Sequence, residues 1–290
     1  MFKKFLNDNK IIKPFWNFSQ KGNLWRFIIA GSDIIAGETR DIQNRIVYFF
    51  TLQISTGKTY LKNFTFENGN YWISIEGATD DILFLHRYIK PEMPDHKDII
   101  AIDIRTGKFL WENIEFAYLF NSPSRLFGLK QKFESTEIGE IDLSTGKLMN
   151  TVQKEKHSEI YELKYYSDTQ LIEENFNYPA VYRASDSSDI VKNYFEDFLT
   201  SKKVEGNIEY IEKKDFLIFN YYVVSGTDIK DINRKYFKNI FTISDLKNSN
   251  ILYTDIMSEN SNYNVPDNFF INKEFLFYLK GKKEIVAIKL

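Results

Sequence analysis

Two of the three histidines in this 290-residue chain have neighbours suited to chemistry. His86 falls in an expected strand, and His96 falls in the loop after it, residues 91–98, together with Glu92 and Asp95. Two imidazoles near carboxylates can hold a divalent metal that keeps a position open for water, as metal-assisted hydrolysis requires. This spacing matches no known metal motif, so a core histidine beside a polar loop is the alternative interpretation. His86, His96 and Asp95 are the candidate metal ligands.

Thr-Gly-Lys occurs three times and suggests phosphate binding. A phosphate loop needs a glycine five positions before the Gly-Lys pair, but Leu52, Ile102 and Ile141 stand there. The tripeptides are therefore predicted to be turns of a repeat. The sequence also contains no Ser-His-Asp order, nucleophile elbow or dinucleotide-binding glycine pattern. With no cysteine it has no thiolate nucleophile and no cysteine metal site.

These turns belong to an internal repeat, seen in residues 52–58, 102–108 and 141–147. In each copy, apolar residues stand three and five positions before the glycine, which is the period of a strand with one buried face. The glycine supplies the positive φ of a hairpin turn, and a polar residue four positions earlier can accept hydrogen bonds from turn amides. The second copy continues into a strand that ends at Trp111.

Two weaker copies extend the repeat toward the C-terminus. Residues 245–253 carry Ser249 in place of the glycine, and Ala287–Leu290 begins another copy that stops with the chain. Lys13–Trp16 matches the outgoing strand that this last copy lacks. The N-terminal segment 10–18 is therefore expected to complete the C-terminal unit and to close a ring.

Such a ring of four-stranded units is a β-propeller, which covers the open edges and apolar faces of its blades. Clear copies are about 40–50 residues apart, a spacing typical of blades. The step from Gly146 to Ser249 is about twice as long. We therefore expect an all-β fold in which residues 1–290 form one β-propeller of six blades, with five or seven as alternatives.

The long step also departs from the strand pattern. From Ile190 to Leu199, apolar residues recur with helical spacing, and Ser187 or Ser188 can cap the helix. The sequence thus predicts one inserted helix near residues 186–201, within an insertion over 178–201. Ile160–Tyr166 is predicted to be a blade strand, and His157, in a charged run, is predicted to be a solvated linker residue.

Charge and hydropathy limit the possible partners. Lys plus Arg number 38 and Asp plus Glu number 40, so the net charge of −2 offers little attraction to nucleic acid. The N-terminus lacks the unbroken apolar run of a secretion signal, and no segment approaches the roughly 20 apolar residues of a membrane helix. We therefore expect a cytoplasmic protein that binds neither nucleic acid nor membrane.

The repeat resembles that of quinoprotein-type propellers, whose units carry the pattern aliphatic-Asp-aliphatic-x-Thr-Gly-Lys followed by Trp. The whole chain looks more like an uncharacterised family of short bacterial propeller-like proteins. The segments that suggest this are Gly37–Asp41, Leu85–Tyr88, Pro91–Lys97 and Tyr178–Tyr182. This resemblance implies a fold and no known activity.

In a propeller, polar loops at equivalent positions of two blades emerge on one face. Glu38–Asp41 is predicted to occupy the inter-strand position in blade one that residues 91–98 occupy in blade two. The candidate ligand-binding patch comprises Glu38, Arg40, Asp41, His86 and His96. The alternative for the first three is a surface ion pair worth only about 0–1 kcal/mol.

Two functions follow from these observations. The first is a non-catalytic β-propeller that binds an unknown protein or small-molecule ligand and has no cofactor. The second is a metal-dependent hydrolase or lyase that uses His86 and His96 with Glu38 or Asp95.

Overall fold

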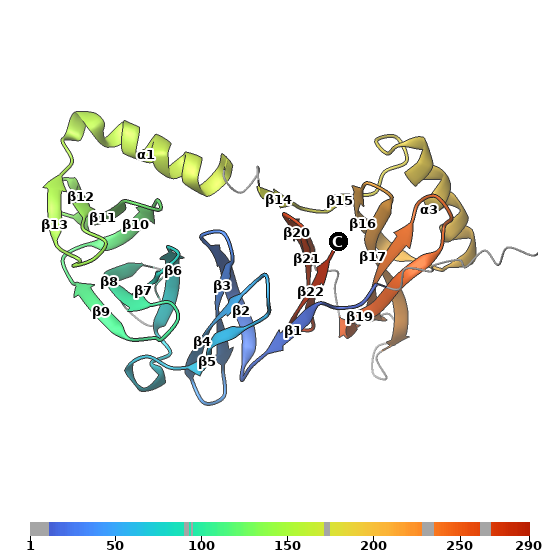
Figure 1. Ribbon diagram of the computed structural model, residues 1–290, viewed down its shortest axis with the longest axis horizontal. Coiled ribbons are helices and arrows are strands. Elements are labelled where there is room, and N and C mark those ends of the chain that lie inside the picture. The colour runs from blue at the N-terminus through green and yellow to red at the C-terminus, as the bar shows by residue number, and fades with distance from the viewer. Residues whose placement is uncertain (1–11, 90–92, 94, 171–174, 228–234, 262–267) are drawn as a thin grey trace, which may run out of the picture. The chain divides into compact units, whose positions relative to one another are not determined.

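The computed structural model describes residues 12–89, 93, 95–170, 175–227, 235–261 and 268–290. The chain divides into two compact units, Phe18–Glu174 and a second unit made of Met1–Asn17 with Asn175–Leu290. The described residues form five antiparallel sheets of four or five strands (Figure 1). The all-β fold class predicted from the sequence is therefore confirmed.

The unit Phe18–Glu174 contains three sheets, each with its four strands in sequence order. The first sheet contains β2 (Asn23–Ala30), β3 (Ile34–Asp41), β4 (Ile46–Gln53) and β5 (Thr59–Phe64). The second, after the short 3-10 helix η1 (Glu67–Gly69), contains β6 (Ile73–Ala78), β7 (Ile82–Tyr88), β8 (His96–Asp103) and β9 (Phe109–Asn113). The third contains β10 (Ala117–Asn121), β11 (Leu126–Gln131), β12 (Thr136–Ile141) and β13 (Leu148–Thr151).

The predicted repeat turns have the expected geometry. Gly57, Gly107 and Gly146 have φ values of 70°, 71° and 70°, and Ser249 at the equivalent position has a φ of 55°. The carboxylate of Asp103, four positions before Gly107, accepts hydrogen bonds from the backbone N–H groups of residues 105 and 106. The sequence therefore identified both the turn conformation and the side chain that stabilises it.

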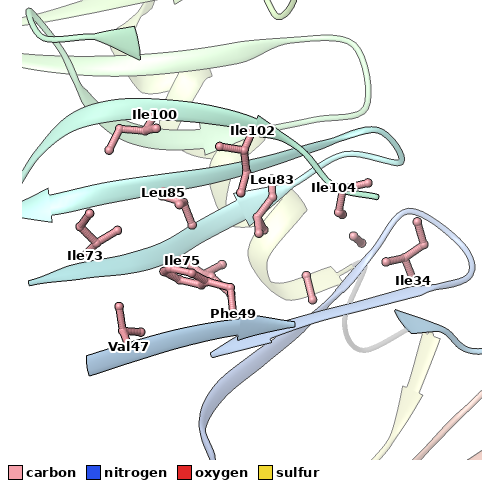
Figure 2. Packing of buried hydrophobic residues seen from close by; sticks show 12 residues of the cluster. Ile34, Val47, Phe49, Ile73, Ile75, Leu83, Leu85, Ile100, Ile102 and Ile104 are labelled. Carbon is pink, nitrogen blue, oxygen red and sulfur yellow. The ribbon is translucent and has the colours of Figure 1, made fainter. Parts of the chain in front are cut away.

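Apolar side chains that alternate along the strands form the core between the first two sheets. Figure 2 shows Val47 and Phe49 of β4 facing Ile73 and Ile75 of β6 and Leu85 of β7. The repeat turns also contribute to packing between sheets, because Trp111 at the end of the second sheet lies against Gly146 of the third. A Cβ at Gly146 would lie 2.3 Å from that indole, so this close approach requires glycine.

The other unit contains two five-stranded sheets. The fourth sheet contains β15 (Ala180–Val181), β16 (Glu205–Lys213), β17 (Phe216–Thr227), β18 (Lys235–Asp245) and β19 (Ile251–Ser261). The fifth contains, in order, β1 (Trp16–Ser19), β22 (Glu284–Lys289), β21 (Phe275–Lys280), β20 (Phe269–Asn272) and β14 (Phe176–Asn177). The first described strand is thus adjacent to the last, and the N–H of Phe15 donates to the carbonyl of Ala287 at 2.7 Å.

The inserted helix is present as α3 (Asp189–Ser201). The hydroxyl of Ser188 accepts a hydrogen bond from the N–H of Val191 and caps the helix, as the sequence predicted. Phe195 and Phe198 are buried against Phe219 of β17, so the apolar stripe of the helix covers the fourth sheet. The segment before the helix is not wholly an insertion, because β15 within it is a strand of that sheet.

One strand predicted within the long step is wrong. The predicted strand Ile160–Tyr166 is instead helical, in α1 (His157–Tyr165). This helix follows the 3-10 helix η2 (Lys154–Lys156) and continues into the π-helical turn η3 (Tyr166–Gln170). Ile160 is the buried residue of α1 and packs on the third sheet. The apolar residues of this mostly polar helix lack a strong helical period, so tertiary packing of Ile160 stabilises it.

The expected count of six blades is not found in the described residues, which form five sheets. The described residues between Gly146 and Ser249 include the helices α1 and α3 and strands of unusual length, with β17 spanning 12 residues. Its extra length therefore does not add a second complete sheet. Among the described residues, no helix has the length and apolar character needed to cross a membrane.

Candidate functional site

The polar residues Glu38 and Arg40 lie in strand β3, and the loop predicted for them is wrong. Both are buried, with side-chain exposures of 0 % and 5 %, so the predicted surface ion pair is wrong as well. Because they are two residues apart, their side chains lie on the same face of β3. The Arg40 guanidinium donates a hydrogen bond to Glu38 Oε1 at 2.9 Å. Burial alone would lower the pKa of Arg40. The adjacent Glu38 carboxylate outweighs this effect, so the pKa of Arg40 lies above its ordinary value.

This ion pair joins the first sheet to the free edge of strand β6 in the second. Glu38 Oε2 accepts hydrogen bonds from the Ser74 hydroxyl at 2.7 Å and the Ile75 N–H at 2.9 Å. Arg40 donates to the carbonyls of Tyr71 and Ile73. The pair therefore supplies hydrogen-bond partners to a sheet edge that would otherwise expose unpaired backbone groups. All four oxygen contacts of Glu38 are structural.

One residue further along β6, irregular strand pairing turns a different carboxylate toward the histidines. The β6–β7 register runs from Ile75 opposite Leu85 to Gly77 opposite Phe84, which leaves Glu76 as the extra residue of a β-bulge. Bulges re-aim side chains and are frequent beside functional sites. Glu76 thereby reaches His86, the residue that follows Leu85 in β7.

A second irregularity lies on the other side of His86. In the β7–β8 pairing, Leu85 is opposite Ile100 and Arg87 is opposite Lys97, so one residue of β7 faces two of β8. Asp98, one of those two, has a φ of 63°, and its carboxylate accepts a hydrogen bond from Arg87 at 3.0 Å. The middle strand of the cluster is thus flanked by a bulge on each side.

His86, His96 and Glu76 form one compact cluster. The two imidazole rings are stacked, with centroids 3.5 Å apart and an interplanar angle of 12°. Glu76 Oε1 lies 2.9 Å from His86 Nδ1 and 2.6 Å from His96 Nδ1. One ligand atom from each residue falls within 4.8 Å of the others, and no other such group occurs among the described residues.

Hydrogen bonding within the cluster is unequal. His96 Nδ1 has hydrogen-bond geometry to Glu76, but His86 Nδ1 is off the bond direction despite its short distance. Both ring nitrogens of His86 are therefore buried without a hydrogen-bond partner in the structure, although the side chain is only 1 % exposed. A buried polar group in this state costs free energy that a ligand can recover.

Charge and exposure distinguish the members further. Burial raises the pKa of Glu76, but the two adjacent imidazoles outweigh this effect and lower it to about 2. The Glu76 side chain is 10 % exposed and that of His96 is 34 % exposed, so solvent reaches the cluster at His96. The ring of Tyr88 stands edge-on to both imidazoles, at 4.8 Å from His86 and 5.3 Å from His96.

The remaining candidates lie elsewhere. Asp41 accepts hydrogen bonds from the backbone and side chain of Asn44, which lowers its pKa and stabilises the β3–β4 turn. Asp95 is exposed and outside the cluster, while its backbone carbonyl accepts a hydrogen bond from Ile89. Glu92 lies outside the described residues. His157 is in α1, with Nε2 at 3.3 Å from the carbonyl of Val152, and is not a linker residue.

Sequence reasoning missed Glu76 and paired the histidines with Glu38 or Asp95 instead. The available signal was a carboxylate followed by Gly77 within an apolar alternating strand, a pattern in which glycine often marks a bulge. The prediction also put His96 in a loop, whereas it is the first residue of β8 and pairs with Tyr88.

Comparison with known families gives one match. A family model described as "Domain of unknown function (DUF4905)" matches residues 29–111, which contain the whole Glu76–His86–His96 cluster. No curated protein matches the chain.

Several solved structures are similar at low sequence identity. A europium-containing methanol dehydrogenase is 11 % identical with a TM-score of 0.30, covering 94 % of this chain and 52 % of its own. BamB from Moraxella catarrhalis is 8 % identical with a TM-score of 0.25, covering 97 % of this chain and 100 % of its own. The Dos1 propeller is 10 % identical with a TM-score of 0.32, covering 93 % and 62 %. This chain thus spans about half the length of the methanol dehydrogenase.

Proposed function

We propose that this protein is a non-catalytic β-propeller module that binds a small ligand or protein partner at the Glu76–His86–His96 cluster. The observation that carries the proposal is the buried His86 imidazole, which has no hydrogen-bond partner and lies beneath the partly exposed ring of His96. A ligand that enters beside His96 can reach a buried polar group that lacks a hydrogen-bond partner.

The charge state of the cluster favours binding over proton transfer. A general base works best when its pKa is close to the operating pH. The pKa of Glu76 is about 2, so this carboxylate is a weak base at neutral pH, and its Oε1 atom already contacts both imidazoles. Glu38, the other carboxylate considered for catalysis, has four donors around its two oxygens.

The alternative function is a metal-dependent hydrolase or lyase. It keeps His86 and His96, but Glu76 takes the role that the sequence assigned to Glu38 or Asp95. A carboxylate and two histidines are a ligand set used by hydrolytic zinc centres. The same cluster therefore supports both functions, and only turnover distinguishes them.

The test is turnover of chromogenic substrates by the purified 290-residue chain. We expect hydrolysis of p-nitrophenyl acetate and bis(p-nitrophenyl) phosphate to be the same for the native protein and for His96→Asn, both alone and with added Zn²⁺ or Mn²⁺. His157→Asn controls for general imidazole reactivity, because this third histidine lies outside the cluster. Turnover that His96→Asn abolishes and His157→Asn preserves would refute the non-catalytic proposal.

We also propose that residues 1–290 form one closed propeller, in which the N-terminal segment completes the C-terminal blade. The adjacency of β1 to β22 and the Phe15–Ala287 hydrogen bond support the second part of this proposal, completion of the C-terminal blade. Deletion of residues 1–18 would expose the edge of β22 and remove the Trp16 and Phe15 rings from Phe277 and Phe275. We expect a large drop in melting temperature, and an unchanged melting temperature would exclude closure by this segment.

A further inference from the structure

We propose that Glu76, His86 and His96 bind a divalent transition-metal ion of the zinc class. This inference rests on the proposed function, because it specifies the ligand of the same cluster. The three side chains come from the neighbouring strands β6, β7 and β8, so the sheet itself holds them together. A site on adjacent strands is more rigid than one assembled from loops.

The donor set selects the class of ion. Imidazole nitrogens suit zinc, copper, nickel and iron, whereas Mg²⁺ and Ca²⁺ prefer oxygen ligands. Two of the three donors here are imidazoles and the third is a carboxylate. Three protein ligands with one partly exposed member leave a coordination position for water or for a ligand atom.

His86 provides the independent observation that points to a ligand. Its two ring nitrogens are without hydrogen-bond partners although the side chain is 99 % buried, and one of them lies 2.9 Å from the Glu76 carboxylate. A neutral imidazole always carries one bare lone pair, which is the form that a metal requires. A metal bond to this lone pair would compensate the buried nitrogen.

The stacked rings indicate what must move. The lone pair of an imidazole nitrogen lies in the plane of its ring, so stacked rings 3.5 Å apart keep their lone pairs in two nearly parallel planes and cannot both point at one ion. His96 has the room to turn, because its side chain is 34 % exposed, whereas His86 is fixed by burial. Metal binding should therefore separate the stack through rotation of the His96 ring.

The composition of the chain makes the site easy to isolate experimentally. There is no cysteine to compete for a soft ion, and the only other histidine is His157 in α1. The imidazole ¹⁵N spectrum of the full-length protein, with any affinity tag removed, therefore contains three histidines. Two of them belong to the site and the third is an internal control.

The experiment is titration with Zn²⁺, followed by calorimetry and by the imidazole ¹⁵N signals, with Mg²⁺ as the comparison ion. We expect one Zn²⁺ per chain, with signal changes at two of the three histidines and no matching effect of Mg²⁺. His96→Asn and Glu76→Gln should each weaken Zn²⁺ binding more than about tenfold, while His157→Asn should leave it unchanged. His96→Asn is the main variant because replacement of the buried His86 could impair folding.

Two results would overturn the metal site. They are no stoichiometric binding of Zn²⁺ to the native chain, or binding that His96→Asn and Glu76→Gln leave within twofold of the native affinity. These results are distinct from failure of the proposed function. Zn²⁺ binding accompanied by His96-dependent turnover would refute the non-catalytic role and leave the metal site intact.

Discussion

Two carboxylates on strands of different sheets, Glu38 buried and Glu76 only 10 % exposed, have opposite surroundings. Glu38 of β3 receives four hydrogen bonds, two from the Arg40 guanidinium and two from Ser74 and Ile75. Glu76 of β6 contacts two stacked imidazoles through a single oxygen, and one of those imidazoles lacks hydrogen-bond partners. The folded chain supplies all the hydrogen-bond partners of Glu38. In the cluster that contains Glu76, it leaves the His86 imidazole without a hydrogen-bond partner.

The difference shows how a structural polar cluster can be separated from a binding site. Both carboxylates are shielded from water, so burial alone does not distinguish them. Hydrogen-bond satisfaction does, because a fully partnered buried group fixes the packing, while an unpartnered one costs free energy until something binds. By this criterion Glu38 and Arg40 serve stability, and Glu76, His86 and His96 are the residues that we propose to bind a ligand.

The largest expected effect is on stability, from Arg40→Met. The substitution leaves the Glu38 carboxylate buried without its cation and should lower the free energy of unfolding by about 3–5 kcal/mol. Urea denaturation followed by circular dichroism measures the change. The double variant Glu38→Gln with Arg40→Met removes the uncompensated charge and should recover much of the loss. A single variant within about 1 kcal/mol of the native protein would contradict the structural role.

How well the sequence predicts an element depends on whether local chemistry or tertiary packing determines that element. The repeat turns were predictable because local chemistry determines them, with glycine for positive φ and Asp103 for the turn amides. Helix α3 was predictable because its apolar residues have helical spacing and Ser188 stands where that helix needs an N-cap. Helix α1 was not, because its residues alternate enough to resemble a strand, and tertiary contact through Ile160 decides its structure.

The candidate site was only partly predictable for a related reason. His86 and His96 stood out by residue type, but their partner depends on a bulge that shifts the register by one residue. Strand periodicity contains no such shift, so the sequence pattern points to Glu38 and not to Glu76. The segment Glu38–Asp41 looked like a loop because it is charged, although it ends strand β3, in which every residue from Ile34 to Asp41 pairs with a residue of β4.

An intermediate effect is expected for a fully partnered carboxylate in the other unit. Asp255 accepts hydrogen bonds from Lys280 at 2.9 Å and from the Tyr278 hydroxyl at 2.7 Å. Burial raises the pKa of Asp255, but these bonds outweigh it and hold the pKa below its ordinary value. Asp255→Asn should therefore cost on the order of 1–2 kcal/mol at pH 7.

The acid dependence of this contribution follows from the direction of the pKa shift. A depressed folded pKa gives stability that is present above the unfolded pKa of about 3.9 and is lost as the pH falls through the folded pKa. The gap between native and Asp255→Asn unfolding free energies should thus narrow below about pH 4. Asp215→Asn, which breaks an exposed ion pair with Lys247, is the control and should have little effect at either pH.

The smallest expected effect on stability is that of Glu76→Gln without metal, and it is the sharpest test of the comparison. The amide oxygen can still accept from His96, and removal of a buried charge offsets part of what is lost, so the free energy of unfolding should stay within about 1 kcal/mol of the native value. The same substitution at Glu38 leaves Arg40 buried without its anion and should cost several times more. Urea denaturation of the two variants in chelator compares them directly. Equal losses would mean that Glu76 is also a structural carboxylate, and the distinction between the two clusters would then fail.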